Sequence, residues 1–363
     1  MRQWLHEERW VMKKDMKRVT LITALMLLIS VVARAQMPGG ATPVPEPAPI
    51  PTTRPTPPPD HLSNLSPGAS LPSDASCTTM ANASAFPETV PQNVNDGTGW
   101  NNNHQLWTTP SYFYANAGGS VIGFSNSDFT NVNGNYAGST LGIMRWAACK
   151  WGVDEDWVYA QSYQEDGQRQ DCAALHGGTG CRSGGDCGHP DGSDPTTTAN
   201  LSFMGFATTS SAGHFIGPNA ITSTCGQPYA SWGIIQTKAQ YAEWYTWPML
   251  AISTAWNEDY RWAKYRACVN GDSAKVTYFT SQNEASGADY SAAISRATSR
   301  PNGAVPGGQL GPTNLFAGET NLQYLALGCM ATHFSGGWYD SGASTYAGKF
   351  IGYLNAQDWP GGR

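Results

Sequence analysis

The chain has 363 residues, of which 40% are hydrophobic and 13% charged, enough for one large domain with its own core or for two small ones. Residues 1–35 hold seven of the 21 basic and three of the 27 acidic residues, so the remainder carries a net charge of −10. Because phosphate binding requires a basic surface, this charge argues against nucleic acid as a partner.

The first 35 residues are predicted to be a signal peptide for export. Basic residues between positions 13 and 18 precede the apolar run 19–33, and Ala33-Arg34-Ala35 offers a cleavage site. Met12 and Met16 are alternative start residues. The apolar run is too short to span a bilayer comfortably, so no stable membrane span is expected. The sequence thus predicts a secreted or periplasmic protein, and retention through an uncleaved anchor is the alternative.

A linker and the start of the folded domain are predicted next. Residues 36–76 form a Pro-rich linker, extended and polyproline-like between Pro38 and Pro72. The folded domain covers 77–363. Its first part, 77–136, is rich in Asn, Gly, Ser and aromatic residues, which favours short strands and loops. We expect it to wrap the rest of the domain, although a small glycan-binding lobe also fits.

Two helices and a tight turn are predicted over residues 139–167. The first covers Ser139–Trp151, and Asp154 is a good N-cap for the second. Gly167 ends that second helix in the manner of C-terminal glycines. Glu165 therefore lies in the last turn, near the negative end of the helix dipole.

The environment of Glu165 decides between two interpretations of this carboxylate. Val158, Gln161 and Glu165 share one helical face, and Trp157, Tyr159 and Tyr163 are near in sequence. Partial desolvation and the dipole both favour the protonated form, as a general acid requires. The alternative is an ordinary surface glutamate at a helix end.

Eight cysteines follow the signal, and four of them lie in a Gly- and Cys-rich insertion over 171–227. An even number in an exported chain favours four disulfides, and Cys149–Cys268 is the pairing we expect between two core helices. Zinc is the alternative for the cysteines and histidines of the insertion. The eight cysteines are Cys77, Cys149, Cys172, Cys181, Cys187, Cys225, Cys268 and Cys329.

Three further helices are predicted toward the C-terminus. One ends at Cys268 and turns Ala255, Tyr260 and Ala263 inward. The others cover 285–300, for which partial disorder is the alternative, and 346–354. We find no phosphate loop, nucleophile elbow, HExxH or EF-hand pattern, so no cofactor and no metal is expected.

Three stretches resemble the lysozyme-like superfamily, and within it the soluble lytic transglycosylases and goose-type lysozymes. They read WAACKWGVDED at 146–156, AQSYQED at 160–166 and SWGIIQTK at 231–238. In that group a helix-terminal Glu precedes a Gly-hydrophobic-hydrophobic-Gln motif, which Glu165 and residues 233–236 match. The resemblance covers roughly 131–359 and implies a mainly helical α+β fold with irregular or β insertions.

The resemblance also implies an activity and a set of site residues. The family cleaves the MurNAc-GlcNAc β-1,4 bond of peptidoglycan, with Glu165 as catalytic acid and base. Gln236 is expected to contact a substrate amide or hydroxyl and Trp232 to stack on a sugar. Asn257 resembles a family asparagine, and His333 begins a segment that stands where transglycosylases carry Tyr-Asn-Ala-Gly.

Departures from the family pattern leave alternatives open. Asp166 stands where the family usually has Ser; it could perturb Glu165, act as a base or point to solvent. Arg261 stands where a glycine is expected after Asn257. With one well-motivated carboxylate, transglycosylase chemistry is favoured over hydrolysis, for which Asp166 and Asp171 are the second candidates. A chitinase- or chitosanase-like hydrolase and a non-catalytic wall-binding protein remain the other functional alternatives.

Overall fold

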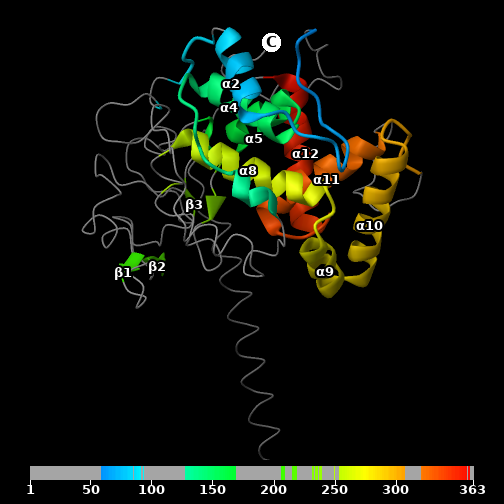
Figure 1. Ribbon diagram of the computed structural model, residues 1–363. Coiled ribbons are helices and arrows are strands. Elements are labelled where there is room, and N and C mark those ends of the chain that lie inside the picture. Colours follow the sequence, from blue (N-terminus) through cyan, green and yellow to red (C-terminus); the bar gives the residue numbers. More distant parts are fainter. Residues whose placement is uncertain are drawn as a thin grey trace, which may run out of the picture. The chain divides into compact units, whose positions relative to one another are not determined.

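The computed structural model describes residues 59–84, 86–90, 93, 127–168, 206–208, 215–218, 231–232, 234–235, 237–238, 249, 253–306, 320–357 and 359. The chain divides into the units Met1–Pro49 and Ile50–Arg363, and these residues all belong to the second. That unit is mainly helical (Figure 1). Its elements are α2 (Asp74–Ala83), η3 (Ser127–Asn131), α4 (Thr140–Trp151), α5 (Glu155–Asp166), β1 (Phe206–Thr208), β2 (Phe215–Pro218), β3 (Ser231–Trp232), β4 (Thr237–Lys238), α8 (Thr254–Val269), α9 (Ser273–Gln282), α10 (Glu284–Ser299), α11 (Asn321–Ser335) and α12 (Ser341–Ala356).

Helices α4 and α8 form the centre of the core. Every residue of α4 is buried, and so is every residue of α8 apart from Lys264. Helix α4 packs against α2, α5 and α8, while α8 also packs against α11. Helix α12 packs against both α5 and α11, which places the end of α5 within reach of side chains from α12.

The helices predicted around these positions are confirmed. Ser139 caps α4 by accepting a hydrogen bond from the Gly142 amide, and Asp154 caps α5 by accepting one from the Asp156 amide. Gly152 and Gly167 end the two helices in the left-handed conformation. The helices predicted near the C-terminus correspond to α8, α10 and α12.

The N-terminal part of the domain differs from its prediction. Residues 74–83, expected as linker and then loop or strand, form helix α2, capped by Ser73. Its sequence of small polar residues has little apolar periodicity, which is why the pattern missed it. Asp74 accepts a hydrogen bond from the Trp146 indole at 2.8 Å, so tertiary contacts to α4 compensate for weak helical periodicity.

The predicted linker also ends earlier than expected. From about residue 60 the chain is bonded to the helical core instead of extending away from it. The Leu65 amide donates to the Gly152 carbonyl at 2.9 Å, and the Arg266 guanidinium donates to the carbonyls of Leu65 and Ser66. A Cβ at Gly152 would meet Leu65 within 2.5 Å, so this segment packs closely over the α4–α5 turn.

The predicted Cys149–Cys268 disulfide is wrong. Cys149 pairs with Cys77 on α2, and Cys268 pairs with Cys329 on α11. Although α4 and α8 do pack together, each cysteine is bonded to a different neighbouring helix. The insertion cysteines, and the histidines of the zinc alternative, lie outside the residues that the structure describes.

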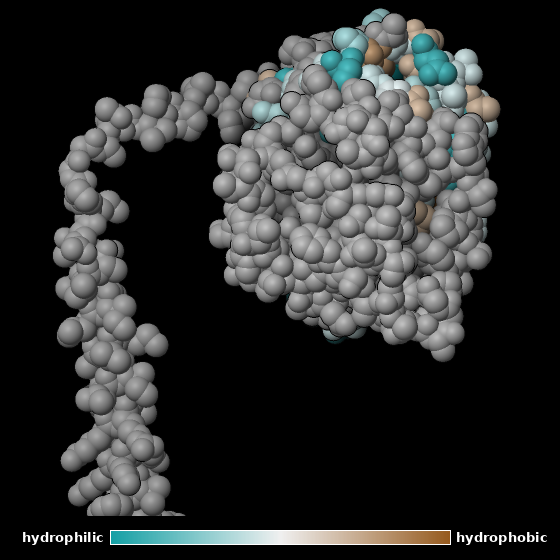
Figure 2. All heavy atoms as spheres, turned by 90° about the vertical axis from the view of Figure 1, so that its left-hand side faces the viewer, coloured by the Kyte–Doolittle hydropathy of each residue, from teal (hydrophilic) through white to brown (hydrophobic). Residues whose placement is uncertain are grey.

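Strands are short in the described part of the chain. β1 and β2 form an antiparallel hairpin in the predicted insertion, and β3 pairs antiparallel with β4 around the Gly-Ile-Ile-Gln segment. In the described ranges, no helix combines the length and apolar character needed to cross a bilayer. On the face shown in Figure 2, the coloured area is small and mixes hydrophilic and hydrophobic residues.

Candidate functional site

Glu165 lies in the last turn of α5, and its side chain is 15% exposed. The left-handed Gly167 directly after the helix accounts for its abrupt end, because the Gly167 amide turns back onto the Tyr163 carbonyl. Trp157, Tyr159 and Tyr163, expected around Glu165, pack instead against Phe350, Trp359 and Tyr353 respectively. The carboxylate therefore stands at the edge of the core, partly open to solvent.

A buried chain of hydrogen bonds ends on the Glu165 carboxylate. The Tyr346 hydroxyl of α12 donates to Glu165 Oε1, and Gln161 Nε2 donates to that hydroxyl at 3.0 Å. Arg261 Nε in turn donates to Gln161 Oε1 at 3.1 Å. Burial and the neighbouring Glu165 charge raise the pKa of Tyr346 well above its usual value, so the hydroxyl stays a donor. These contacts hold the carboxylate in one orientation.

His333 brings a second segment to the same carboxylate. Its Nε2 lies 3.7 Å from Glu165 Oε1 and 2.9 Å from the Ile235 carbonyl oxygen. The Ile235 amide donates to Asn257 Oδ1 at 3.2 Å. The backbone of Ile235 is thus held between His333 and Asn257, and His333 connects it to Glu165.

The structure brings some of the predicted site residues together, while others lie outside the residues that it describes. Glu165 and His333 are in contact range, whereas Asn257 is fully buried and acts on the Ile235 backbone. Ile234 and Ile235 are also fully buried. Gln236, Asp171 and the side chains of Trp232 and Asp166 lie outside the described part, so their predicted roles stay predictions.

The other acidic side chains described on α5 and α8 are buried and already paired. Asp259 contacts Lys150 at 2.7 Å, and Asp156 accepts from Gln357 at 3.1 Å. Burial raises the pKa of Glu258 to about 7, although hydrogen bonds from Ser162 and Trp262 oppose the shift. Among the described carboxylates of these two helices, Glu165 is the one with a partly exposed side chain.

Sequence reasoning missed Tyr346 as a site residue. Its only signal was its place as the first residue of a predicted terminal helix, and nothing in the spacing connected it with Glu165, 181 positions earlier. Arg261 was noted only as a departure from the family glycine, and the structure gives it a buried contact to Gln161 instead.

For the general-acid role that the sequence predicts for Glu165, replacing Tyr346 with Phe should lower the rate of the catalysed reaction about 10- to 100-fold, because Glu165 loses the donor that orients it. The loss of a donor to a carboxylate should also move the pH optimum upward. Initial rates measured across pH test this expectation. Tyr353→Phe, on the same helix and packed edge-on against Tyr163, is the matched control. An unchanged rate and pH profile in Tyr346→Phe would show that the tyrosine has only a packing role.

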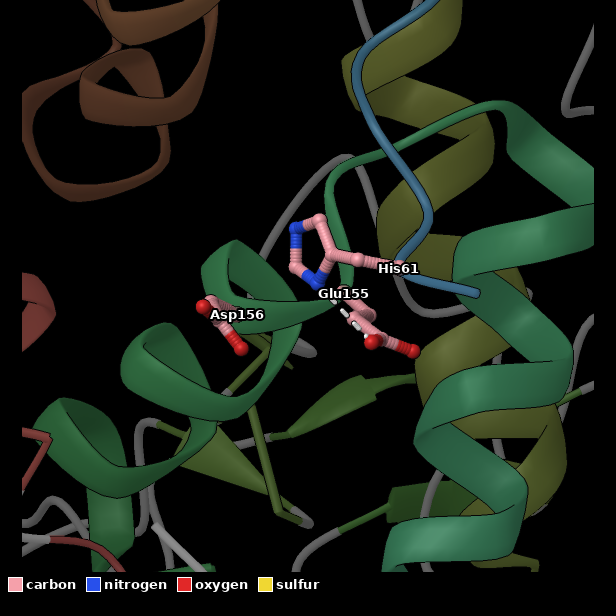
Figure 3. A group of neighbouring side chains, drawn as sticks. All are labelled: His61, Glu155 and Asp156. Carbon is pink, nitrogen blue, oxygen red and sulfur yellow. Dashed lines mark hydrogen bonds and ion pairs between the residues drawn. The ribbon is translucent and has the colours of Figure 1, made fainter. Parts of the chain in front are cut away.

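A second polar cluster lies at the start of α5 (Figure 3). His61 reaches over the helix from the N-terminal segment, while Glu155 and Asp156 extend from one turn in different directions. Their possible ligand atoms lie within 4.8 Å of one another, a spacing compatible with a metal ion. However, His61 Nδ1 is 2.9 Å from Glu155 and Nε2 is 3.1 Å from Asp154, so both ring nitrogens already face carboxylates. We interpret these contacts as ion pairs that hold the chain around His61 against the start of α5, and we call His61, Asp154 and Glu155 the clasp.

This clasp predicts a loss of stability in alkaline solution. Burial opposes the charge on His61, but its bonds to Asp154 and Glu155 outweigh burial and raise its pKa to about 9 from 6.5. The unfolded chain releases this proton near pH 6.5 and the folded chain near pH 9. The contribution is therefore complete below pH 6.5 and lost as pH rises through 9.

Urea unfolding at several pH values measures this effect. The free energy of unfolding should fall by about 2 kcal/mol between about pH 6.5 and 9.5 in the wild type, because solvent screening reduces the effect of the pKa shift. In His61→Gln this part of the pH dependence should disappear, because the amide does not titrate. Parallel curves for the two proteins would contradict the clasp.

Comparisons with protein-family models, with curated proteins and with solved structures return no match for this chain.

Proposed function

We propose that this chain is an exported glycosidase that cleaves the MurNAc-GlcNAc β-1,4 bond of peptidoglycan, with Glu165 as general acid and base. The observation that carries the proposal is the setting of Glu165, a partly exposed carboxylate held by Tyr346 and facing His333. The order of sequence motifs adds support, since Glu165 and the Ile234-Ile235 segment are linked in space through His333. The two described disulfides suit an oxidising compartment.

The proposed reaction proceeds in two steps on one carboxylate. Protonated Glu165 gives its proton to the glycosidic oxygen as the bond between this oxygen and C1 of MurNAc breaks. The resulting Glu165 carboxylate then removes the proton from the C6 hydroxyl of the same sugar while O6 attacks C1. A 1,6-anhydro ring forms, Glu165 returns to its protonated state, and no water is consumed.

The roles of the neighbouring residues follow from their hydrogen bonds. Tyr346 and Gln161 keep the carboxylate oriented during both proton transfers, so they are positioning residues. Arg261 places a buried positive charge at the far end of this chain, which favours the carboxylate that exists between the two steps. We favour this mechanism over hydrolysis because Glu165 is the one carboxylate that the sequence motifs single out, and a hydrolase would need a second carboxylate, for which Asp166 and Asp171 remain the candidates.

Clearing of purified peptidoglycan by the purified chain tests the proposed activity. We expect turbidity to fall with time in the wild type, with an optimum between about pH 4 and 7 where one carboxyl group can both give and take a proton. A suspension of chitin incubated in parallel tests the alternative substrate. No release of soluble fragments from peptidoglycan between about pH 4 and 9 would contradict the proposal.

A further inference from the structure

Phe334 is an exposed aromatic side chain next to the candidate site. It is 57% exposed, the largest value for a bulky apolar side chain in the described ranges, where Tyr278 at 37% is the other exposed example. An isolated exposed apolar residue requires no explanation by itself. Phe334, however, directly follows His333 on α11, and His333 lies beside Glu165.

One face of the Phe334 ring is fixed by contacts with the protein. The ring stacks on Tyr346 with centroids 5.5 Å apart and planes inclined by 17°. A Cβ at Gly342 would lie 3.5 Å from the Phe334 ring, so α12 also limits its movement. Helix α11 ends at Ser335, directly after Phe334, and Gly336 caps it in the left-handed conformation.

The contacts of Tyr346 and His333 connect this ring to Glu165. The hydroxyl of the Tyr346 ring beneath Phe334 donates to Glu165, and the residue before Phe334 places Nε2 3.7 Å from the same carboxylate. An aromatic ring that is packed on one side and exposed on the other presents a flat apolar face. Such faces pack well against the CH-rich face of a sugar ring.

We propose that Phe334 is a stacking platform for a sugar ring of the glycan chain whose adjacent glycosidic bond lies at Glu165. This inference rests on the proposed function, because it concerns how the same site holds its substrate. Stacking needs little hydrogen bonding, so the platform would accept GlcNAc-containing chains with or without the lactyl group of MurNAc. The platform therefore sets the position of the chain, and the groups around Glu165 select the bond.

Binding of defined oligosaccharides in the Glu165→Gln background tests the platform without turnover. The probes are a GlcNAc-MurNAc tetrasaccharide and penta-N-acetylchitopentaose, titrated calorimetrically against the full chain. Adding Phe334→Ala should weaken binding of both at least tenfold, whereas Phe334→Trp should retain it. Tyr278→Ala, which removes the other exposed ring on α9, is the matched control and should change binding less than twofold.

Four results would overturn the platform. They are unchanged binding in the Phe334→Ala variant, equal losses in the Phe334→Ala and Tyr278→Ala variants, loss of binding in Phe334→Trp, and the absence of glycan binding in the Glu165→Gln parent. The proposed glycosidase activity is judged separately. If the wild type leaves peptidoglycan intact while Phe334→Ala abolishes glycan binding, the platform stands and the catalytic proposal fails. If the wild type cleaves peptidoglycan but Phe334→Ala leaves glycan binding unchanged, the catalytic proposal stands and the platform fails.

Discussion

Replacing Glu165 with Gln should reduce the rate of peptidoglycan cleavage about a thousandfold or more, because the amide can neither donate nor accept the transferred proton at the required steps. The amide oxygen can still accept the Tyr346 hydroxyl, so the fold around α5 should be preserved. Initial rates of fragment release, measured beside the free energy of unfolding, separate loss of chemistry from loss of structure.

A matched control for this substitution is Glu284→Gln. Glu284 is exposed in the first turn of α10, and replacing it with Gln removes the same charge from the surface. It should cleave peptidoglycan at the wild-type rate. A Glu165→Gln protein that retains more than about a tenth of the wild-type rate would contradict the catalytic assignment.

The second large effect concerns stability and is expected from Asp259→Ala. Asp259 is fully buried and accepts hydrogen bonds from Lys150 at 2.7 Å, from the Trp151 indole at 2.6 Å, and from the amides of Asn133 and Gly134. Removing the carboxylate leaves the buried Lys150 ammonium without its counter-charge. The free energy of unfolding should fall by about 3–5 kcal/mol, measured by urea unfolding.

A double variant identifies the source of that loss. In Lys150→Met/Asp259→Ala the charge is removed together with its partner, so the total loss should be smaller than the sum of the two single losses. Additive losses would show that the pair does not interact, and a loss below about 1 kcal/mol in Asp259→Ala would contradict its structural role.

The parts of the fold that follow from local signals could be predicted from the sequence. Helices α4 and α5 have polar N-caps and C-terminal glycines, and these features gave their limits to within a residue. Helix α11 was not predicted, partly because Gly328 lies in its interior. A Cβ there would come within 2.4 Å of the Trp338 ring, so this glycine allows a close contact and does not break the helix.

The parts that depend on long-range packing could not be predicted. The Cys149–Cys268 pairing assumed that two adjacent helices share a disulfide. Cys149 is instead bonded to Cys77 on α2 and Cys268 to Cys329 on α11, and local sequence does not report which neighbouring helix a cysteine meets. Within the candidate site, the sequence correctly predicted that Gln161 and Glu165 share one face of a helix, because this spacing is local. Their common contact, Tyr346, is contributed by a helix far along the chain, so no spacing pattern reports it.

The mass of the fragments released from purified peptidoglycan tests the central claim most directly. Wild-type protein should release muropeptides that end in 1,6-anhydro-MurNAc and are one water lighter than hydrolysed products, while Glu165→Gln should release neither kind. Fragments with only water-added reducing ends would contradict the single-carboxylate mechanism. Equal release by the wild type and Glu165→Gln would contradict the assignment of Glu165 itself.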